Sequence, residues 1–134
     1  MQSSLNLLHK DGGRVLKKIE ELGFEVAHIG INCSNPIEAK HLCEQFETAF
    51  GFVGKEGNSS FFASKGIEIL KHMFKGEKGH IAIKTNNINA AIENLQARGY
   101  KFDQSTSKYD KEGNISAIYL AESIGGFAIH LVQG

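Results

Sequence analysis

Two segments of this chain follow the same residue pattern, and this repeat limits the available folds more than any other feature. Residues 27–31 read Ala-His-Ile-Gly-Ile and residues 79–83 read Gly-His-Ile-Ala-Ile, so both follow the order small, His, Ile, small, Ile. A helix-like stretch and three short strand-like runs follow each segment. A unit of roughly 50 residues that exposes one sheet face cannot close a core alone, so two copies are expected to pair, within one chain or across a dimer.

The helix of each unit is predicted from its ends and its apolar spacing. Asn35 can cap the first helix, and Gly51 supplies a left-handed stop. In the second unit Asn86 or Asn87 is the expected cap, and Gly99 the expected end. Between these ends apolar residues recur at the spacing of one buried helix face, at Ala39, Leu42, Cys43, Phe46, Ala49 and Phe50 and at Ile88, Ala91, Ile92 and Leu95.

These units predict the domain boundaries. Residues 24–134 are expected to form one domain, with a first module at about 24–74 and a second at about 79–134. Residues 1–23 are expected to be an N-terminal appendage with a short helix, in whose apolar stripe Val15 lies. Turn residues separate the other expected strands, which lie at about 52–56, 59–63, 66–71, 101–105, 115–121 and 127–132.

One face of the expected sheet collects side chains that can bind a metal ion. Because side chains alternate along a strand, four strands divide into an apolar Ile, Leu and Phe face and a second face with one ligand type per strand. Burial and mutual repulsion oppose the protonation of histidines that lie close together in such a cavity, so they are expected to be neutral. A divalent cation would stabilise such a group by binding to the neutral imidazoles and the carboxylate. A single histidine would more often be structural, but four matching repeat positions favour a metal site formed by His28, Glu68, His80 and His130.

The ligand types restrict the metal and its chemistry. An imidazole-rich set with one carboxylate suits zinc, nickel, cobalt, manganese or iron better than calcium or magnesium, and the sequence does not choose among them. Four protein ligands on an octahedral ion leave two positions for adjacent oxygens of a substrate. The ion then acts as a Lewis acid that stabilises an enediolate or similar oxyanion, while a nearby base moves a proton.

These motifs resemble the vicinal oxygen chelate superfamily, which includes glyoxalase I, extradiol dioxygenases, methylmalonyl-CoA epimerase and bleomycin resistance proteins. The resemblance covers about residues 24–133, and the segments at 26–29, 66–69 and 79–83 match those that carry the family's ligands. It implies an α+β, glyoxalase-like fold in which two paired βαβββ modules form a cup-shaped mixed sheet with helices on the outer face. It also implies a homodimer.

The last ligand position departs from the family pattern. The family usually has a glutamate there, whereas this chain has His130, so Glu68 becomes the candidate catalytic base. A weaker resemblance, carried by residues 57–60, 107–110 and 124–128, is to a branch associated with 2-keto-3-deoxy-6-phosphogluconate aldolase.

Three functions follow as hypotheses. The first is a metal-dependent lyase or isomerase of glyoxalase-like type acting on a small oxygenated metabolite. The second, motivated by the missing glutamate, is a non-catalytic small-molecule-binding or regulatory domain linked to sugar-acid metabolism. The third is an iron-dependent dioxygenase with a two-histidine, one-carboxylate triad, against which the fourth ligand argues. Strand parity and turn position suggest that the substrate is contacted by Asn58, Ser60, Phe62, Lys84 and Tyr119.

Composition excludes several other classes. The chain has 15 basic and 15 acidic residues, so it lacks the basic surface that binding to nucleic acid or an anionic membrane requires. It has no apolar run of roughly 18 residues and no signal-like start, so a cytoplasmic protein is expected. Cys33 and Cys43 are in no metal-binding or redox spacing, and buried thiols are expected rather than nucleophiles.

Overall fold

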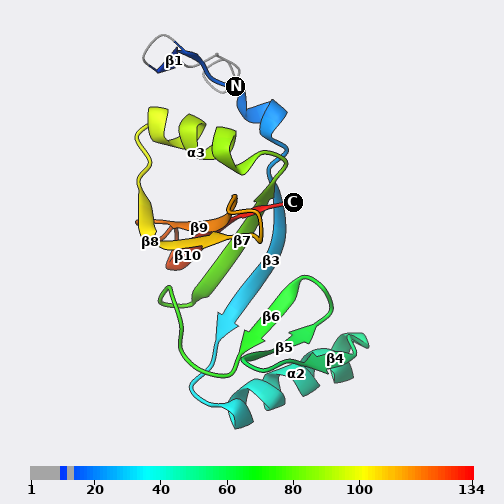
Figure 1. Ribbon diagram of the computed structural model, residues 1–134. Coiled ribbons are helices and arrows are strands. Elements are labelled where there is room, and N and C mark those ends of the chain that lie inside the picture. The colour runs from blue at the N-terminus through cyan, green and yellow to red at the C-terminus, as the bar shows by residue number, and fades with distance from the viewer. Residues whose placement is uncertain (1–9, 12–13) are drawn as a thin grey trace. The chain divides into compact units, whose positions relative to one another are not determined.

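The order of strands and helices repeats as the sequence predicts. The computed structural model describes residues 10–11 and 14–134 (Figure 1). Its first module consists of β3 (Glu25–Asn32), α2 (Pro36–Phe50), β4 (Gly54–Glu56), β5 (Ser60–Ala63) and β6 (Ile67–Leu70). Its second consists of β7 (Gly79–Thr85), α3 (Ile88–Ala97), β8 (Phe102–Tyr109), β9 (Ile115–Leu120) and β10 (Phe127–Gln133). The chain divides into two compact units, which are described separately.

Hydrogen bonding joins the main strands into one mixed sheet. The eight strands follow the order β4-β5-β6-β3-β7-β10-β9-β8. Strand β3 runs parallel to β6, whereas β5 runs antiparallel to both β4 and β6, and β9 antiparallel to both β8 and β10. The mixed sheet with two helices is the arrangement that the family resemblance implies.

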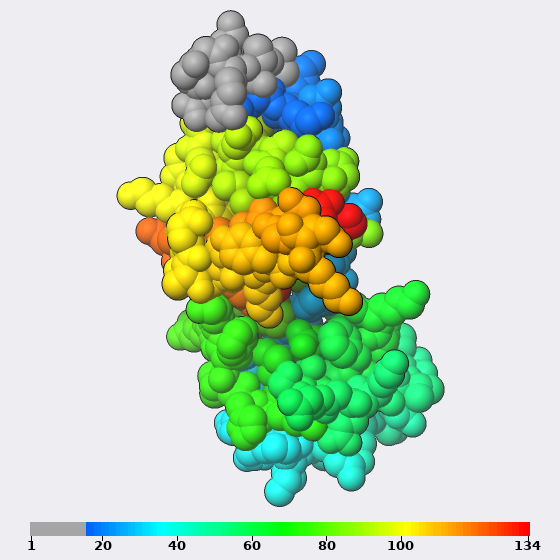
Figure 2. All heavy atoms as spheres, in the orientation of Figure 1, coloured from blue at the N-terminus to red at the C-terminus, as the bar shows by residue number. Residues whose placement is uncertain are grey.

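Unit 2 comprises residues 27–82 and 123–128 and contains α2 with β4, β5 and β6. Its core lies on one sheet face, where Ala39 and Cys43 of α2 pack with Phe61, Ala63 and Ile69 of the strands. In Figure 2 the green and cyan atoms of this helix and these strands form one continuous surface. Because strand side chains alternate, the opposite face of β5 and β6 is left to carry Ser60 and Glu68.

Unit 1 comprises the described residues up to 26 together with 83–122 and 129–134. Here Ile88 and Ala91 of α3 pack with Ile118 of β9, Leu131 of β10 and Leu22 of the 3-10 helix η1 (Ile19–Leu22). Each helix therefore covers one face of its own strands, as the apolar stripes predict. Among the described residues, no helix combines the length and the apolar content that crossing a membrane requires.

Both helices begin at the predicted asparagines. Asn35 Oδ1 accepts the backbone N–H of Glu38 at 2.9 Å, and Asn87 Oδ1 accepts that of Ala90 at 3.0 Å. Of the two asparagines that could cap the second helix, Asn87 is the cap. The Asn86 amide instead donates to the backbone oxygen of Glu21 at 3.1 Å. An asparagine cap stabilises the helix because its side chain accepts a hydrogen bond from a backbone N–H group that would otherwise have no partner within the helix.

The structure corrects two expected elements. Val15 is not in a helix: it lies in the short strand β2 (Arg14–Val15), which pairs with β1 (Lys10–Asp11), and among the described residues before residue 24 only η1 is helical. Strand β8 continues to Tyr109 instead of ending near residue 105. Its polar residues are tolerated because β8 is at the sheet edge and Thr106 Oγ1 accepts the backbone N–H of Tyr119 at 2.9 Å, beside a register shift.

Cys33 and Cys43 are buried free thiols, as predicted. Burial raises the pKa of both thiols, and Glu38 raises that of Cys33 further. We therefore expect both to react with a thiol reagent at least about 100-fold more slowly in the native protein than in denaturant, because the thiolate is the reactive form. Rapid labelling of one thiol in native protein, measured by mass spectrometry, would contradict this burial.

Candidate metal centre

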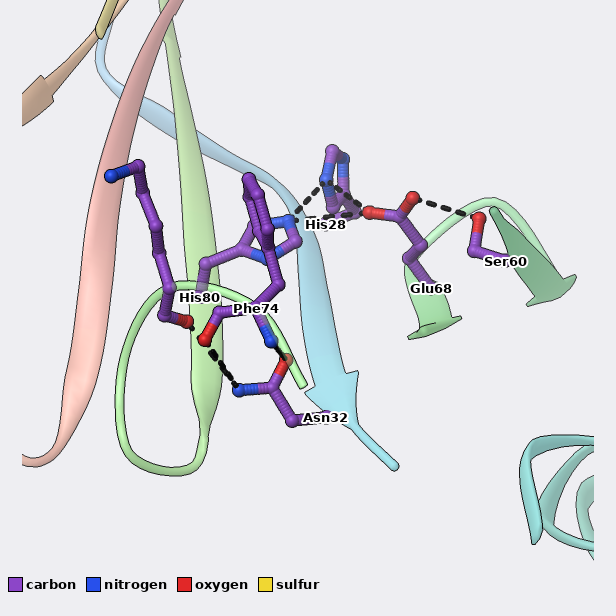
Figure 3. Close-up of polar contacts among 7 residues, drawn as sticks. His28, Asn32, Ser60, Glu68, Phe74 and His80 are labelled. Carbon is purple, nitrogen blue, oxygen red and sulfur yellow. Dashed lines mark hydrogen bonds and ion pairs between the residues drawn. The ribbon is translucent and has the colours of Figure 1, made fainter. Parts of the chain in front are cut away.

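Three of the predicted ligands come together within unit 2. His28 lies on β3, Glu68 on β6 and His80 on β7 (Figure 3). His28 Nε2 lies 3.1 Å from His80 Nε2, and Glu68 Oε1 lies 3.4 Å from the first nitrogen and 3.2 Å from the second. The three possible ligand atoms therefore form a nearly equilateral triangle.

The register of the strands places these side chains on one face. Gly30 of β3 is the partner of Glu68 of β6, so His28, two residues before Gly30, lies on the same face as Glu68. A side chain at Gly30 would overlap the imidazole ring of His80. The glycine is therefore required so that the His80 ring can lie over β3, and the sequence signal for it was only a small residue in the repeated pattern.

Ser60 and Phe62, predicted as substrate contacts, also lie at this centre. Ser60 is buried, and its hydroxyl donates to Glu68 Oε2 at 2.9 Å (Figure 3). The Phe62 ring meets the His28 ring edge-on, with centroids 5.9 Å apart. Ser60 thus holds one carboxylate oxygen while the other faces the imidazoles, a positioning contact that the sequence did not predict.

Electrostatics favour Glu68 as a ligand. Hydrogen bonds from His28 and then His80 hold the pKa of the Glu68 carboxyl well below its usual range, and the Ser60 hydroxyl adds to this effect although burial opposes it. The carboxylate is therefore ionised near neutral pH, as a metal ligand must be, whereas a general base works best with a pKa near the working pH. The contacts therefore support the ligand role of Glu68 more strongly than its predicted role as base.

The three atoms fit a divalent metal ion. Ligands that share an ion at about 2.0–2.1 Å lie roughly 2.9–3.4 Å apart for coordination angles between octahedral and tetrahedral. The observed separations of 3.1, 3.2 and 3.4 Å match this range. Two imidazoles and one carboxylate also match the donors preferred by zinc, iron, nickel, cobalt and manganese.

The other predicted site residues belong to unit 1 or to a turn of unit 2. His130 and Tyr119 belong to unit 1, where their rings stack with centroids 4.3 Å apart and an interplanar angle of 2°. Lys84, also in unit 1, is exposed and its amine lies 3.4 Å from Glu25 Oε1. Asn58 is exposed in the turn before β5. The structure thus brings together His28, Glu68, His80, Ser60 and Phe62, while the roles of the others stay predictions.

Comparisons with known proteins agree at the level of structure. The sequence matches no family model and no curated protein. A methylmalonyl-CoA epimerase structure aligns with a TM-score of 0.56 at 14% identity, covering 81% of this chain and 93% of that one. The methylmalonyl-CoA epimerase from Mycobacterium tuberculosis has the same score and identity and covers 81% and 86%. A hypothetical protein from Bacillus halodurans C-125 has a TM-score of 0.58 at 15% identity and covers 84% and 95%.

These similarities identify the fold. The chain has the glyoxalase-like fold of these methylmalonyl-CoA epimerases, so the predicted fold class is confirmed. A further epimerase with this fold, at 16% identity and a TM-score of 0.54 over 81% of this chain and 93% of its own, is described in complex with methylmalonyl-CoA and NH4+. At such identities the likeness carries the fold, and the activity must be argued from the site itself.

Proposed function

We propose that this chain is a metal-dependent isomerase or lyase of glyoxalase-like type that acts on a small oxygenated metabolite. The observation that carries this proposal is the triangle of His28 Nε2, Glu68 Oε1 and His80 Nε2, with sides of 3.1 to 3.4 Å. A shared fold with several epimerases supports the isomerase class. His130 as a fourth ligand and a homodimeric assembly remain predictions from the sequence.

Each residue of the centre has a defined part in this proposal. A bound divalent ion supplies a Lewis acid that stabilises negative charge on a substrate oxygen. His28 and His80 would hold the ion through Nε2, and Glu68 would hold it through Oε1. Ser60 donates a hydrogen bond to Oε2, the oxygen that would not hold the ion, and the role of Glu68 as the proton-accepting base stays a prediction from the sequence. Phe62 contacts the edge of the His28 ring and would lie beside the substrate.

Proton exchange is the test of this activity. Metal-loaded protein in D2O is expected to exchange the hydrogen on the carbon next to a carbonyl in at least one 2-hydroxyacyl compound, 2-keto acid or methylmalonyl thioester that it binds, as followed by NMR. A general acid or base contributes about 10²–10⁴-fold, so Glu68→Gln should lower the exchange rate by at least about 100-fold. The control His72→Ala, at an exposed position, should keep the wild-type rate.

The same measurement separates the rival functions. Binding without exchange for every compound tested would favour the non-catalytic binding domain. An iron-dependent dioxygenase is the second candidate, because two histidines and one carboxylate are the ligands of the facial triad in such enzymes. That candidate predicts oxygen uptake by iron-loaded protein, which His130→Ala would retain together with the metal.

A further inference from the structure

We propose that an open cleft on β4 and β5 is a subsite for a phosphate or carboxylate group at the far end of the substrate. The cleft lies within unit 2, has a volume of about 610 Å³ and is lined by residues that include Val53, Lys55, Phe62, Ser64 and Lys65. The inference deepens the proposed function, on which it rests, by naming a substrate class: compact acids with a second anionic group.

The sheet register connects this cleft to the metal centre. Across neighbouring strands, Gly30 is the partner of Glu68, Glu68 of Phe62, and Phe62 of Lys55. Residues directly opposite each other in a ladder share a face, so this row places Lys55 on the face that carries the ligands. Phe62 is common to both sites, because it lines the cleft and contacts the His28 ring.

The charge of the cleft suits an anion. Among the described residues, neither Lys55 nor Lys65 is in an ion pair. The one acidic lining residue, Glu56, follows Lys55 and therefore points to the opposite face, where its Oε2 lies 2.7 Å from the amine of Lys71. Two lysine charges are thus left for a ligand, in a cleft whose acidic neighbour is already neutralised.

The spacing selects compact substrates. Adjacent strands lie about 4.8 Å apart, so the two steps from Glu68 to Lys55 span roughly 10 Å. A molecule with its chelating oxygens at the metal centre and its chain over the Phe62 ring would place a terminal anion beside Lys55 and Lys65. A terminal phosphate or carboxylate of a short sugar acid or keto acid fits this span, whereas the phosphates of coenzyme A lie beyond a much longer pantetheine arm.

Gluconate and 6-phosphogluconate are a matched pair of probes, because they share a 2-hydroxycarboxylate head and differ only in the terminal phosphate. By calorimetry with zinc-loaded protein, we expect 6-phosphogluconate to bind at least about 10-fold more tightly than gluconate, since hydrogen bonds between charged partners are the strong ones. The preference should shrink as salt is added, because both lysines are exposed.

Variants test the residues. Lys55→Gln/Lys65→Gln should abolish the preference for 6-phosphogluconate while the metal content and the affinity for gluconate stay unchanged. The control Lys111→Gln, at an exposed turn between β8 and β9, should retain the preference. Equal affinities in the wild type, a failure to bind 6-phosphogluconate, or a preference that survives the double substitution would overturn the subsite.

The failure of the subsite and that of the proposed function are distinguishable. Protein that holds metal and catalyses proton exchange but shows no phosphate preference would refute the subsite alone. A second binding experiment tests coenzyme A as the other source of phosphate, by comparing methylmalonyl-CoA with the methylmalonyl thioester of pantetheine. Tighter binding of methylmalonyl-CoA that depends on Lys55 and Lys65 would overturn the assignment to compact acids. Protein without metal or exchange would refute the proposed function.

Discussion

His80→Ala is expected to remove the divalent ion from the protein, lowering its affinity by at least about 100-fold. His80 is 4% exposed and supplies one corner of the ligand triangle, so no solvent-facing group can replace it without rearrangement. The measurement is elemental analysis of protein purified without added metal, with about one ion per chain expected in the wild type. The control His41→Ala changes an exposed histidine on α2 and should leave the metal content unchanged.

Chelation should lower the melting temperature of the wild type. An ion present at about 100 times its dissociation constant stabilises the native state by roughly 2.7 kcal/mol, which for a chain of this size corresponds to a shift of about 10 °C. His80→Ala should melt at the same temperature with and without chelator. Wild-type protein that contains no metal, and whose melting ignores both chelator and added zinc, nickel or manganese, would refute the metal centre.

Gly30→Ala is expected to lower the metal affinity about as much as His80→Ala does, although Gly30 has no side chain and is not itself a ligand. The added methyl group would overlap the His80 ring, which is buried and cannot move cheaply. Overpacking of this kind costs about 1–3 kcal/mol, so the variant should also be less stable. Metal content and urea unfolding measure the two effects.

Two further variants isolate the cause. Gly66→Ala is the matched control, because a methyl group there meets no atom within 4 Å, and it should leave metal content unchanged. In the double variant Gly30→Ala/His80→Ala the overlap is gone, so the stability lost in Gly30→Ala should largely return while the metal stays absent. If Gly30→Ala binds metal with wild-type affinity, the His80 ring does not lie over β3 as described.

Much of the architecture was predictable because the local signals agree with one another. Both asparagine caps, both helical stripes and the strand, helix, strand, strand, strand order follow from residues close in sequence. The error at Val15 has the opposite cause: a few apolar residues at helical spacing are ambiguous when no cap supports them, and strand pairing with Lys10 decided the outcome. The polar end of β8 was not predicted, because an edge strand tolerates polar residues of the types that are common in loops.

The candidate site was predictable only as a set of faces. Strand parity placed His28, Glu68 and His80 on the face of each strand opposite its apolar residues, but it does not predict the distances between side chains on different strands. The Ser60 hydroxyl on Glu68 depends on the pairing of β5 with β6, which places Ser60 opposite Leu70 and Phe62 opposite Glu68. Strand parity singled out Ser60 as a substrate contact, but nothing local to Ser60 predicts its hydrogen bond to Glu68.

By itself, therefore, the sequence determined the repeated module, its helix boundaries and the residue types that can bind a metal, because periodicity and capping act within one element. Only the tertiary structure decided that three ligand atoms approach within 3.4 Å and that Gly30 leaves space for His80. It also decided that Lys55 shares a face with the centre. These features depend on the register between strands distant in sequence, which is set by the packing of the whole sheet.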